Sequence, residues 1–468
     1  MEYTHLSEFH IRPGALAVWH GELAPGHQWQ DDPRPLTTVH SLYCYGTDPA
    51  DPRPGKGKWI GTVWEMDAPL EHEAWAETLR LWHARHEGLR TTPKMNADGG
   101  PTRLVCAPDA VTIVHEEFPE VTGSDEINAF LTDVSERSLS PLVWPHVLFG
   151  TVDHGDGNFT VLVAADHSAF DAYSQAIVVL EMRLLYDQVR NGQPIRESET
   201  FLSACDYAQY EVEQANALTI DDPGVTVWRD MLEAADGTMP AFAPELHPDP
   251  LPENPEIQTS VNYHLLTLEE QQTLEAALDV RKHRMSVAVN AALALAYKQT
   301  FGIDSFRAIM PIASRPDLRW LESMGWFVNV VPVDITVDDT NAETVLASTR
   351  DALRRTRDAN NTSWTRALEL LGFDGGPRLG ISFLDVRILP EYDVLEKMRA
   401  RALRAECYSP DEVFLWILRA PDGLRVSTRF PATFPREAMD RYLEAFTTAM
   451  RSFADLSSSA VTESVLAG

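Results

Sequence analysis

The sequence predicts a chain of two α/β halves, each built on a mixed β-sheet. Runs typical of strands and runs with helical periodicity interleave along all 468 residues, without the regular strand–helix–strand rhythm of a doubly wound parallel sheet. Between the halves lie residues 237–258, whose six prolines forbid a regular helix and disfavour a central strand. We therefore expect a first half over residues 1–236, a linker or floor loop over 237–258, and a second half over 259–468.

In the first half, the patterns predict both helices and strands. Apolar and aromatic residues at helical spacing predict one helix over residues 72–90 and another from Asp171 to Asn191, where an Asn-Gly pair ends it. Strands are predicted over residues 58–67, 111–118, 145–153 and 160–165.

The second half repeats the mixture. Helices are predicted over residues 267–281, 285–301, 342–358 and 434–453. Strands are predicted over residues 258–266, 305–312, 326–335, 379–385, 412–419 and 423–430.

The charge balance limits the partners. The chain has 39 Lys and Arg against 70 Asp and Glu, a formal net charge of -31. Such a field repels nucleic acid and anionic lipid surfaces, so neither is expected as a ligand. The apolar fraction, 44%, is ordinary for a globular protein.

The cysteine pattern and the apolar runs indicate a reduced protein of the cytoplasm. The four cysteines are far apart and form no CxxC pair, so neither a disulfide framework nor a zinc knuckle is expected. We expect no signal peptide, because the first residues lack a basic and then an apolar region, and no apolar run is long enough to span a bilayer. We expect a monomer.

Residues 164–174, AADHSAFDAYS, carry the most chemistry. A predicted strand ends at Asp166 and His167, and a predicted helix begins at Asp171. A neutral imidazole held at a strand end can accept a proton from an alcohol or amine. Asp171 can cap the helix or pair with a distant arginine.

The same residue types also serve roles other than acid–base chemistry. A histidine before a helix is often structural. A metal cluster of His154, Asp166, His167 and Asp171 is possible in composition, but the spacing does not support it, and we expect no metal. A Ser-His-Asp hydrolase needs a G-x-S-x-G elbow, and the sequence has none.

The run from Asp166 to Ala172 resembles the HHxxxDG signature of the chloramphenicol acetyltransferase-like superfamily, which includes condensation domains and plant alcohol acyltransferases. Three further segments resemble that superfamily in the same order: LWHARHEGLRTTP (81–93), MPIASRPDLRWLESMGWFVNVVPVDI (310–335) and PRLGISFLDV (377–386). The combination is most similar to the polyketide-associated acyltransferases of mycobacteria and related actinomycetes. The resemblance covers nearly the whole chain.

The resemblance implies a fold and an activity. It implies two chloramphenicol-acetyltransferase-like lobes in a V with a central tunnel, where an acyl group passes from acyl-CoA or a phosphopantetheinyl carrier protein to a hydroxyl or amine. No bound cofactor is implied. Such an enzyme serves lipid or natural-product biosynthesis, on polyketides or nonribosomal peptides.

The resemblance also assigns site residues. His167 takes the position of the general base, and Asp171 would pair with Arg315 to support its loop. Asn329 and Ser382 would lie near the tunnel, although Asn329 is equally a bulge or turn residue. Trp326 and Phe327 are expected to pack within a lobe.

Two departures leave a second function open. Asp166 replaces the first histidine of the signature and would raise the pKa of His167. Ala172 replaces the final glycine and would narrow the thioester's space. The alternative is a non-catalytic, condensation-like module that recruits a carrier protein or partner enzyme, and a thioesterase-like hydrolase is a third hypothesis.

Two basic stretches are candidate docking surfaces for an anionic donor, or else are solvated helix faces. They contain Arg350, Arg354, Arg355 and Arg357, and Lys397, Arg399, Arg401 and Arg404.

Overall fold

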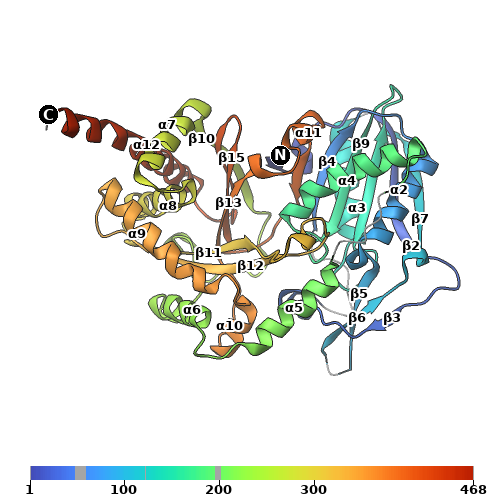
Figure 1. The fold of residues 1–468 in the computed structure, drawn as a ribbon, viewed down its shortest axis with the longest axis horizontal. Coiled ribbons are helices and arrows are strands. Elements are labelled where there is room, and N and C mark those ends of the chain that lie inside the picture. Colours follow the sequence, from blue (N-terminus) through green and yellow to red (C-terminus); the bar gives the residue numbers. More distant parts are fainter. Residues whose placement is uncertain (1, 48–58, 98, 122, 196–201, 467–468) are drawn as a thin grey trace. The chain divides into compact units, whose positions relative to one another are not determined.

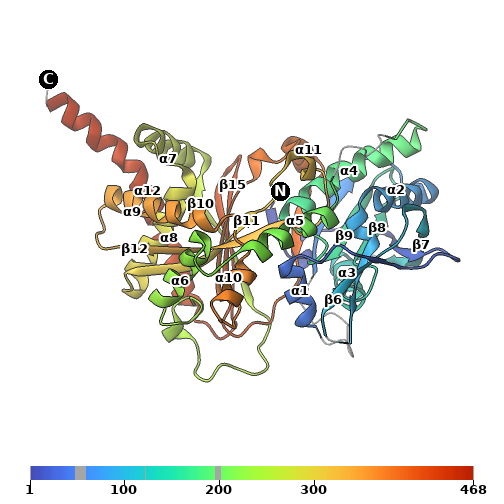
Figure 2. The same cartoon turned by 60° about the horizontal axis from the view of Figure 1, so that its bottom comes forward.

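The computed structural model describes residues 2–47, 59–97, 99–121, 123–195 and 202–466 of a mixed α/β protein (Figures 1 and 2). The chain forms two compact units. Unit 1 comprises Met1–Ala217, Arg315–Val328 and Leu389–Cys407, and unit 2 comprises Leu218–Ser314, Asn329–Ile388 and Tyr408–Gly468. Each unit consists of segments that are separated in the sequence. The predicted boundaries at residues 236 and 259 describe two continuous halves and so do not have this feature. Those boundaries stay a prediction.

Unit 1 contains a seven-stranded mixed sheet in the order β1-β14-β4-β9-β8-β2-β7. Only β1 and β14 pair in parallel. The bounds are β1 Glu2–Thr4, β2 Gly14–Leu23, β4 Trp59–Met66, β7 Val111–Val121, β8 Val147–Asp153, β9 Phe159–Asp166 and β14 Arg401–Arg404. β4, β7, β8 and β9 agree with the predicted strands, except that Lys58 lies outside the described residues.

Strand β9 is buried on both faces, because helices cover both sides of this sheet. Val161 and Val163 pack in one cluster with helices α2 (His72–Arg85) and α4 (Ala172–Arg190). Leu162, on the opposite face, packs with α3 (Ser124–Ser138). A strand held in this way gives the residues that follow it a fixed position.

A second, three-stranded sheet of unit 1 has the order β3-β6-β5. Its strands are β3 Gln30–Asp32, β5 Thr91–Met95 and β6 Pro101–Val105, and they pair antiparallel. The remaining helices of unit 1 are α1 Thr38–Tyr45, α5 Ala204–Ala217 and α11 Tyr392–Lys397.

Unit 2 contains a six-stranded mixed sheet in the order β10-β16-β15-β13-β11-β12. Its strands are β10 Thr259–Thr267, β11 Ser305–Ala313, β12 Val328–Thr336, β13 Leu379–Asp385, β15 Val413–Ala420 and β16 Gly423–Phe430. Its helices are α6 Pro223–Ala234, α7 Leu268–Arg281, α8 Met285–Phe301, α9 Ala342–Arg355, α10 Trp364–Leu370 and α12 Arg436–Leu466. The core forms where the buried helix α8 packs with α12 and the sheet.

The predicted elements of the second half match this unit closely. The strand predictions at 379–385 and 423–430 and the helix prediction at 285–301 agree with β13, β16 and α8 to the residue. In the first half, the helix predicted over 72–90 ends at Arg85, and a 3₁₀ turn follows over Glu87–Arg90. Within the described ranges, no helix is long and apolar enough to cross a membrane.

Candidate active site

The candidate site is the loop between β9 and α4, residues 167–171. Its first turn is fixed by Asp166, which is buried and whose Oδ1 accepts hydrogen bonds from the Ser168 N–H (2.9 Å) and the Ser168 hydroxyl (2.5 Å). The Asp166 N–H donates to the His146 carbonyl on the neighbouring chain segment (2.8 Å). The carboxylate that replaces the signature's first histidine is therefore part of the turn's own hydrogen bonding.

His167 is half-buried and held by the backbone of its own loop. Its Nδ1 lies 3.1 Å from the Phe170 carbonyl oxygen. Because a carbonyl oxygen only accepts, Nδ1 is the donor of this contact, and a neutral ring with its proton on Nδ1 has its lone pair on Nε2. The ring also lies against the Trp326 indole, with centroids 4.7 Å apart and an angle of 34° between the planes.

Asp171 ends the loop and begins α4 as its N-cap. Its Oδ1 accepts from the Ser174 N–H (2.7 Å), which satisfies one of the free donors of the first helical turn. Its Oδ2 accepts from Arg315 Nη1 at 2.6 Å and from the Phe327 N–H at 3.1 Å. The pair is buried, with 2% of the Asp171 side chain and 4% of the Arg315 side chain exposed.

Arg315 has a complete set of contacts. Besides Asp171, its guanidinium donates to the carbonyl oxygens of Trp320 (3.2 Å) and Ser323 (3.2 Å). Its Cζ lies over the rings of Tyr173 (4.7 Å) and Phe327 (4.2 Å). Both ions are thus hydrogen-bonded and enclosed, which is the geometry that a buried ion pair requires.

Burial by itself raises the pKa of the Asp171 carboxyl. The charge of Arg315 and the hydrogen bonds from Arg315 and Ser174 outweigh burial, so the pKa lies below its usual range. Asp171 is therefore ionised at neutral pH.

The segment 315–328 belongs to unit 1 because hydrogen bonds tie it there. The Ser174 hydroxyl on α4 donates to the Gly325 carbonyl (3.1 Å), and the Trp320 indole N–H donates to the Ser203 carbonyl (3.0 Å). These contacts bring Trp326 and Phe327 to the loop. We expected both aromatic residues to pack within a lobe. Phe327 is buried, but the Trp326 ring also lies against the His167 ring.

The other two predicted site residues lie in unit 2. The Asn329 amide donates to the carbonyl oxygens of Ala359 (3.3 Å), Asn360 (3.0 Å) and Thr362 (2.9 Å). These three bonds match a structural role for Asn329. Ser382 is buried on β13, and its proximity to substrate stays a prediction.

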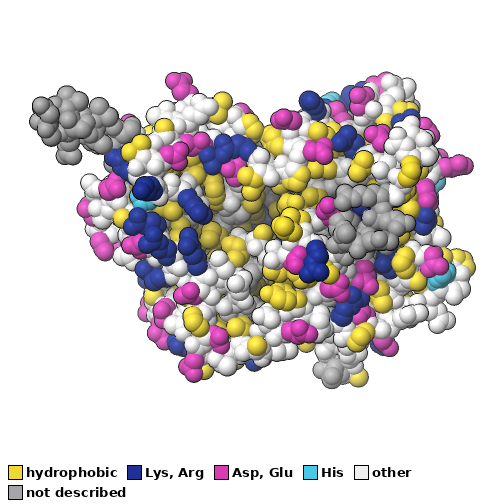
Figure 3. Space-filling model, in the orientation of Figure 1, with side chains coloured by type: hydrophobic (Ala, Val, Ile, Leu, Met, Phe, Trp, Pro, Cys, Tyr) yellow, Lys and Arg dark blue, Asp and Glu magenta, His cyan; other side chains and the backbone are white. Residues whose placement is uncertain are grey.

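Both predicted basic stretches are partly paired with carboxylates, and on α9 Arg350 and Arg354 each lie 3.4 Å from Asp351. On α9 and the turn after it, Arg354, Arg355 and Arg357 are exposed, and Lys and Arg side chains gather over α9 in the space-filling view (Figure 3). In the stretch after α11, Arg399 pairs with Glu65 and Arg401 with Glu396. The second stretch is therefore also partly neutralised by nearby carboxylates.

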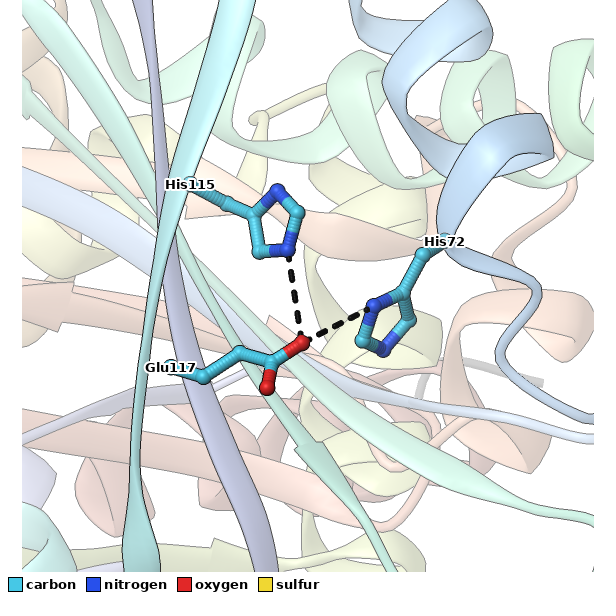
Figure 4. Close-up of side chains that lie close together, drawn as sticks. All are labelled: His72, His115 and Glu117. Atoms are coloured by element: carbon cyan, nitrogen blue, oxygen red, sulfur yellow. Dashed lines mark ion pairs between the residues drawn. The ribbon is translucent and has the colours of Figure 1, made fainter.

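One side-chain cluster with metal-ligand chemistry was not expected from the sequence. His72 Nδ1 on α2 and His115 Nε2 on β7 lie 3.4 Å and 3.5 Å from the same Glu117 oxygen (Figure 4). His115 stacks on Trp19, with ring centroids 4.1 Å apart. All three groups are exposed, and ion pairing on a wet surface explains their contacts without a metal. The residues of the His154–Asp171 cluster do not form a ligand set among the described residues.

Comparison with known proteins identifies a family for this chain. Residues 59–366 match the condensation domain family. The trehalose-2-sulfate acyltransferase PapA2 of Mycobacterium tuberculosis is 23% identical over 456 residues, which span 94% of this chain and 95% of the relative. Malpibaldin synthetase of Mortierella alpina is 23% identical over 304 residues, which span 62% of this chain and 5% of that protein.

Solved structures show the same fold. A PapA2 acyl transferase superposes with a TM-score of 0.84 at 20% identity, over 97% of this chain and 100% of the other. The first condensation domain of the calcium-dependent antibiotic synthetase superposes with a TM-score of 0.68 at 17% identity, over 90% and 96% of the two chains.

Proposed function

Because the chain belongs to the condensation domain family, we propose that it transfers an acyl group from a pantetheine thioester to a hydroxyl or amine. The family and the full-length relatives named as acyltransferases support acyl transfer in lipid biosynthesis. The donor would be acyl-CoA or an acyl carrier protein. The trehalose-2-sulfate acyltransferase PapA2, which matches this chain over 95% of its own length, is named for a sugar sulfate. That name favours a hydroxyl acceptor over an amine.

The observation that carries the proposal is the position of His167, whose Nδ1 lies 3.1 Å from the Phe170 carbonyl oxygen at the end of a strand buried on both faces. A neutral ring that donates from Nδ1 to this carbonyl has its lone pair on Nε2, the atom that we assign as the base. Asp171 and Arg315 hold the far end of the same loop. We assign Asp171 and Arg315 as positioning residues, because they act through the loop and not on the reacting atoms.

The proposed reaction is a single acyl exchange. Nε2 of His167 takes the proton of the acceptor as its oxygen or nitrogen attacks the thioester carbonyl. The tetrahedral intermediate then collapses, the carbon–sulfur bond breaks, and the imidazolium returns the proton to the departing thiolate. The products are an ester or amide and free pantetheine thiol, so atoms and charge balance.

The experiment compares wild type with His167→Ala and His167→Gln. General-base catalysis contributes roughly 10²–10⁴ in rate, so we expect kcat for acyl transfer to fall by that factor in both variants. His154→Ala is the matched control, since His154 is a half-buried histidine in the turn before β9 whose ring nitrogens contact the Pro13 carbonyl and the Thr160 hydroxyl. Equal kcat in wild type and His167→Ala would remove His167 from the chemistry.

Two other functions give different results in the same assay. A non-catalytic module would transfer no acyl group in any variant while still binding an acyl carrier protein. Asp166 and Ala172 depart from the HHxxxDG signature, and these departures are the reason for considering a non-catalytic module. A thioesterase would release free acid at the same rate with and without an acceptor.

A further inference from the structure

A small cavity of about 50 Å³ lies beside the His167 loop, entirely within unit 1. Ser168 and Ala169 of the loop line it, as does Trp326, whose ring lies against the His167 ring. Because one water needs about 10–15 Å³ of such space, the cavity holds a few waters or one small polyatomic ion. Its other polar walls come from Thr37, His40, Thr91, Arg103 and Cys205.

Arg103 is the unusual residue of this cavity. It lies on β6 and is 5% exposed, yet its Nε and Nη1 are buried and make no hydrogen bond to the part of the chain that the structure describes. The buried Arg315 and Arg90 nearby in unit 1 differ, because Arg315 pairs with Asp171 and Arg90 donates to the carbonyls of His83 and Cys106. A buried guanidinium with unsatisfied donors is strongly destabilising, so the retention of Arg103 calls for a partner that supplies acceptor oxygens.

Among the described residues, no carboxylate is hydrogen-bonded to Arg103, although its charge helps to lower the pKa of Asp32. Asp32, which pairs in register with Arg103 between β3 and β6, is buried, and so is Asp166, whose Oδ1 accepts from Ser168 in the cavity wall. Both oxygens of Asp32 are bonded to Arg34, at 3.0 Å and 2.8 Å, and Arg34 also binds Glu87 and Asp206. Asp32, Glu87 and Asp206 are thus hydrogen-bonded to Arg34.

His40 adds a second unused group. Its Nε2 is buried and has no hydrogen-bond partner among the described residues. Burial, with the positive charge of Arg103 next, lowers the pKa of His40 to about 3, so the ring is neutral and can donate one N–H. A planar guanidinium with a neutral N–H beside it is a donor set suited to carboxylate, sulfate or phosphate oxygens.

We propose that this cavity is an anion subsite, in which Arg103 and His40 bind a carboxylate, sulfate or phosphate group of the substrate that reacts at His167. The link to substrate rests on the proposed function. The anion binding does not, because it follows from the cavity and its unpaired donors. Through Ser168 and Trp326 the bound anion would lie against the catalytic loop and orient the rest of the molecule.

The first experiment measures anion binding without turnover. Thermal unfolding is followed in sodium sulfate, phosphate or acetate against sodium chloride of equal ionic strength, for wild type, Arg103→Gln and Arg441→Gln. Arg441 is an exposed arginine on α12, so its variant loses the same charge and controls for the general stabilisation that sulfate and phosphate give. We expect Tm of wild type and Arg441→Gln to rise with anion concentration and then saturate. For Arg103→Gln we expect only the general salt effect on Tm, which does not saturate.

The same data contain a second test. In chloride, Arg103→Gln should be at least as stable as wild type, since it removes an unpaired buried charge, and the order should reverse at saturating anion. A response to sulfate and phosphate but not acetate identifies a tetrahedral group, and the opposite identifies a carboxylate. Identical responses in wild type and Arg103→Gln overturn the subsite. If Arg103→Gln does not fold, equilibrium dialysis of wild type with radioactive sulfate or acetate decides, and binding below one anion per chain at saturation overturns it.

Activity then separates this inference from the proposed function. With an anionic substrate, Arg103→Gln should raise KM by about 10–100-fold and leave kcat within a few-fold, while a neutral analogue shows no change. If wild type binds the anion at Arg103 but transfers no acyl group, the subsite stands and the proposed function fails. If acyl transfer depends on His167 but no anion binds, the reverse holds.

Discussion

Replacing Asp171 with asparagine tests the central ion pair with the smallest change of shape. The carboxylate accepts four hydrogen bonds, two at each oxygen, from Ser174, Phe327 and both terminal nitrogens of Arg315. An amide keeps the volume, but whichever way it turns, its NH₂ faces two donors. Arg315 is then left as a buried guanidinium without a counter-charge.

The expected cost follows from that burial. Breaking a buried, hydrogen-bonded ion pair by removing one partner typically costs about 3–5 kcal/mol, and both side chains here are at least 96% buried. For a unit of about 250 residues, such a loss lowers Tm by roughly 6–20 °C. Catalysis should fall as well, since Asp171 fixes one end of the loop that carries His167.

Thermal or urea unfolding measures the effect against a matched control. Asp156 forms an ion pair with Arg12 at the same 2.6 Å distance, but on the exposed surface. Asp156→Asn should therefore change stability very little. The double variant Asp171→Asn/Arg315→Gln should lose less than the sum of its two single variants, because no lone charge remains.

The reasoning fails if Asp171→Asn and Asp156→Asn shift Tm equally. It also fails if the double variant is as unstable as the two single losses added together. Either result would mean that the buried pair does not hold the loop. The positioning role assigned to Asp171 would then be wrong.

The contacts around the site support three further predictions. The pKa of Asp171 is lower in the folded protein than in the unfolded chain, so the stabilisation from ionised Asp171 is complete above about pH 4 and is lost as the pH falls through the folded pKa. Urea unfolding between pH 2.5 and 6 should therefore show a free energy of unfolding that rises with pH, and Asp171→Asn should remove this rise. Asn329→Ala should lower stability by about 1–3 kcal/mol, because three carbonyls lose their donor, and a raised KM with unchanged Tm would instead place Asn329 at the substrate. Gly325→Ala should cost about 1–3 kcal/mol in a denaturant titration, because the new methyl group would lie 2.7 Å from Phe327 Cε2 and 2.9 Å from the Ala204 Cβ, and an unchanged midpoint would show that these neighbours yield.

Local patterns predicted the elements that local physics controls. Helix α8 was predicted to the residue, because a run of apolar residues ends at a glycine that adopts a left-handed conformation (φ 72°). The helix predicted to start after Asp171 begins there because the aspartate caps it. By contrast, β2 and α3 were not predicted, although they complete the sheet and the core of unit 1.

The candidate active site likewise has parts that the local sequence predicts and parts that it does not. The turn at Asp166 and the His167–Phe170 hydrogen bond are made within a few residues, so a single short motif contains them. Arg315 lies 144 residues from Asp171, and only the family resemblance connected the two. The cavity at Arg103 had no signal at all, since its walls come from α1, β6, α5 and the His167 loop.

By itself, the sequence determined the class of fold, the strand end that presents His167, and the family, because periodicity, capping and a short motif are properties of neighbouring residues. Only the tertiary structure decided which arginine is paired and which is left with unused donors. Pairing depends on what distant segments bring to one point, and the cost of a buried charge depends on those partners and not on the charge's own place in the chain.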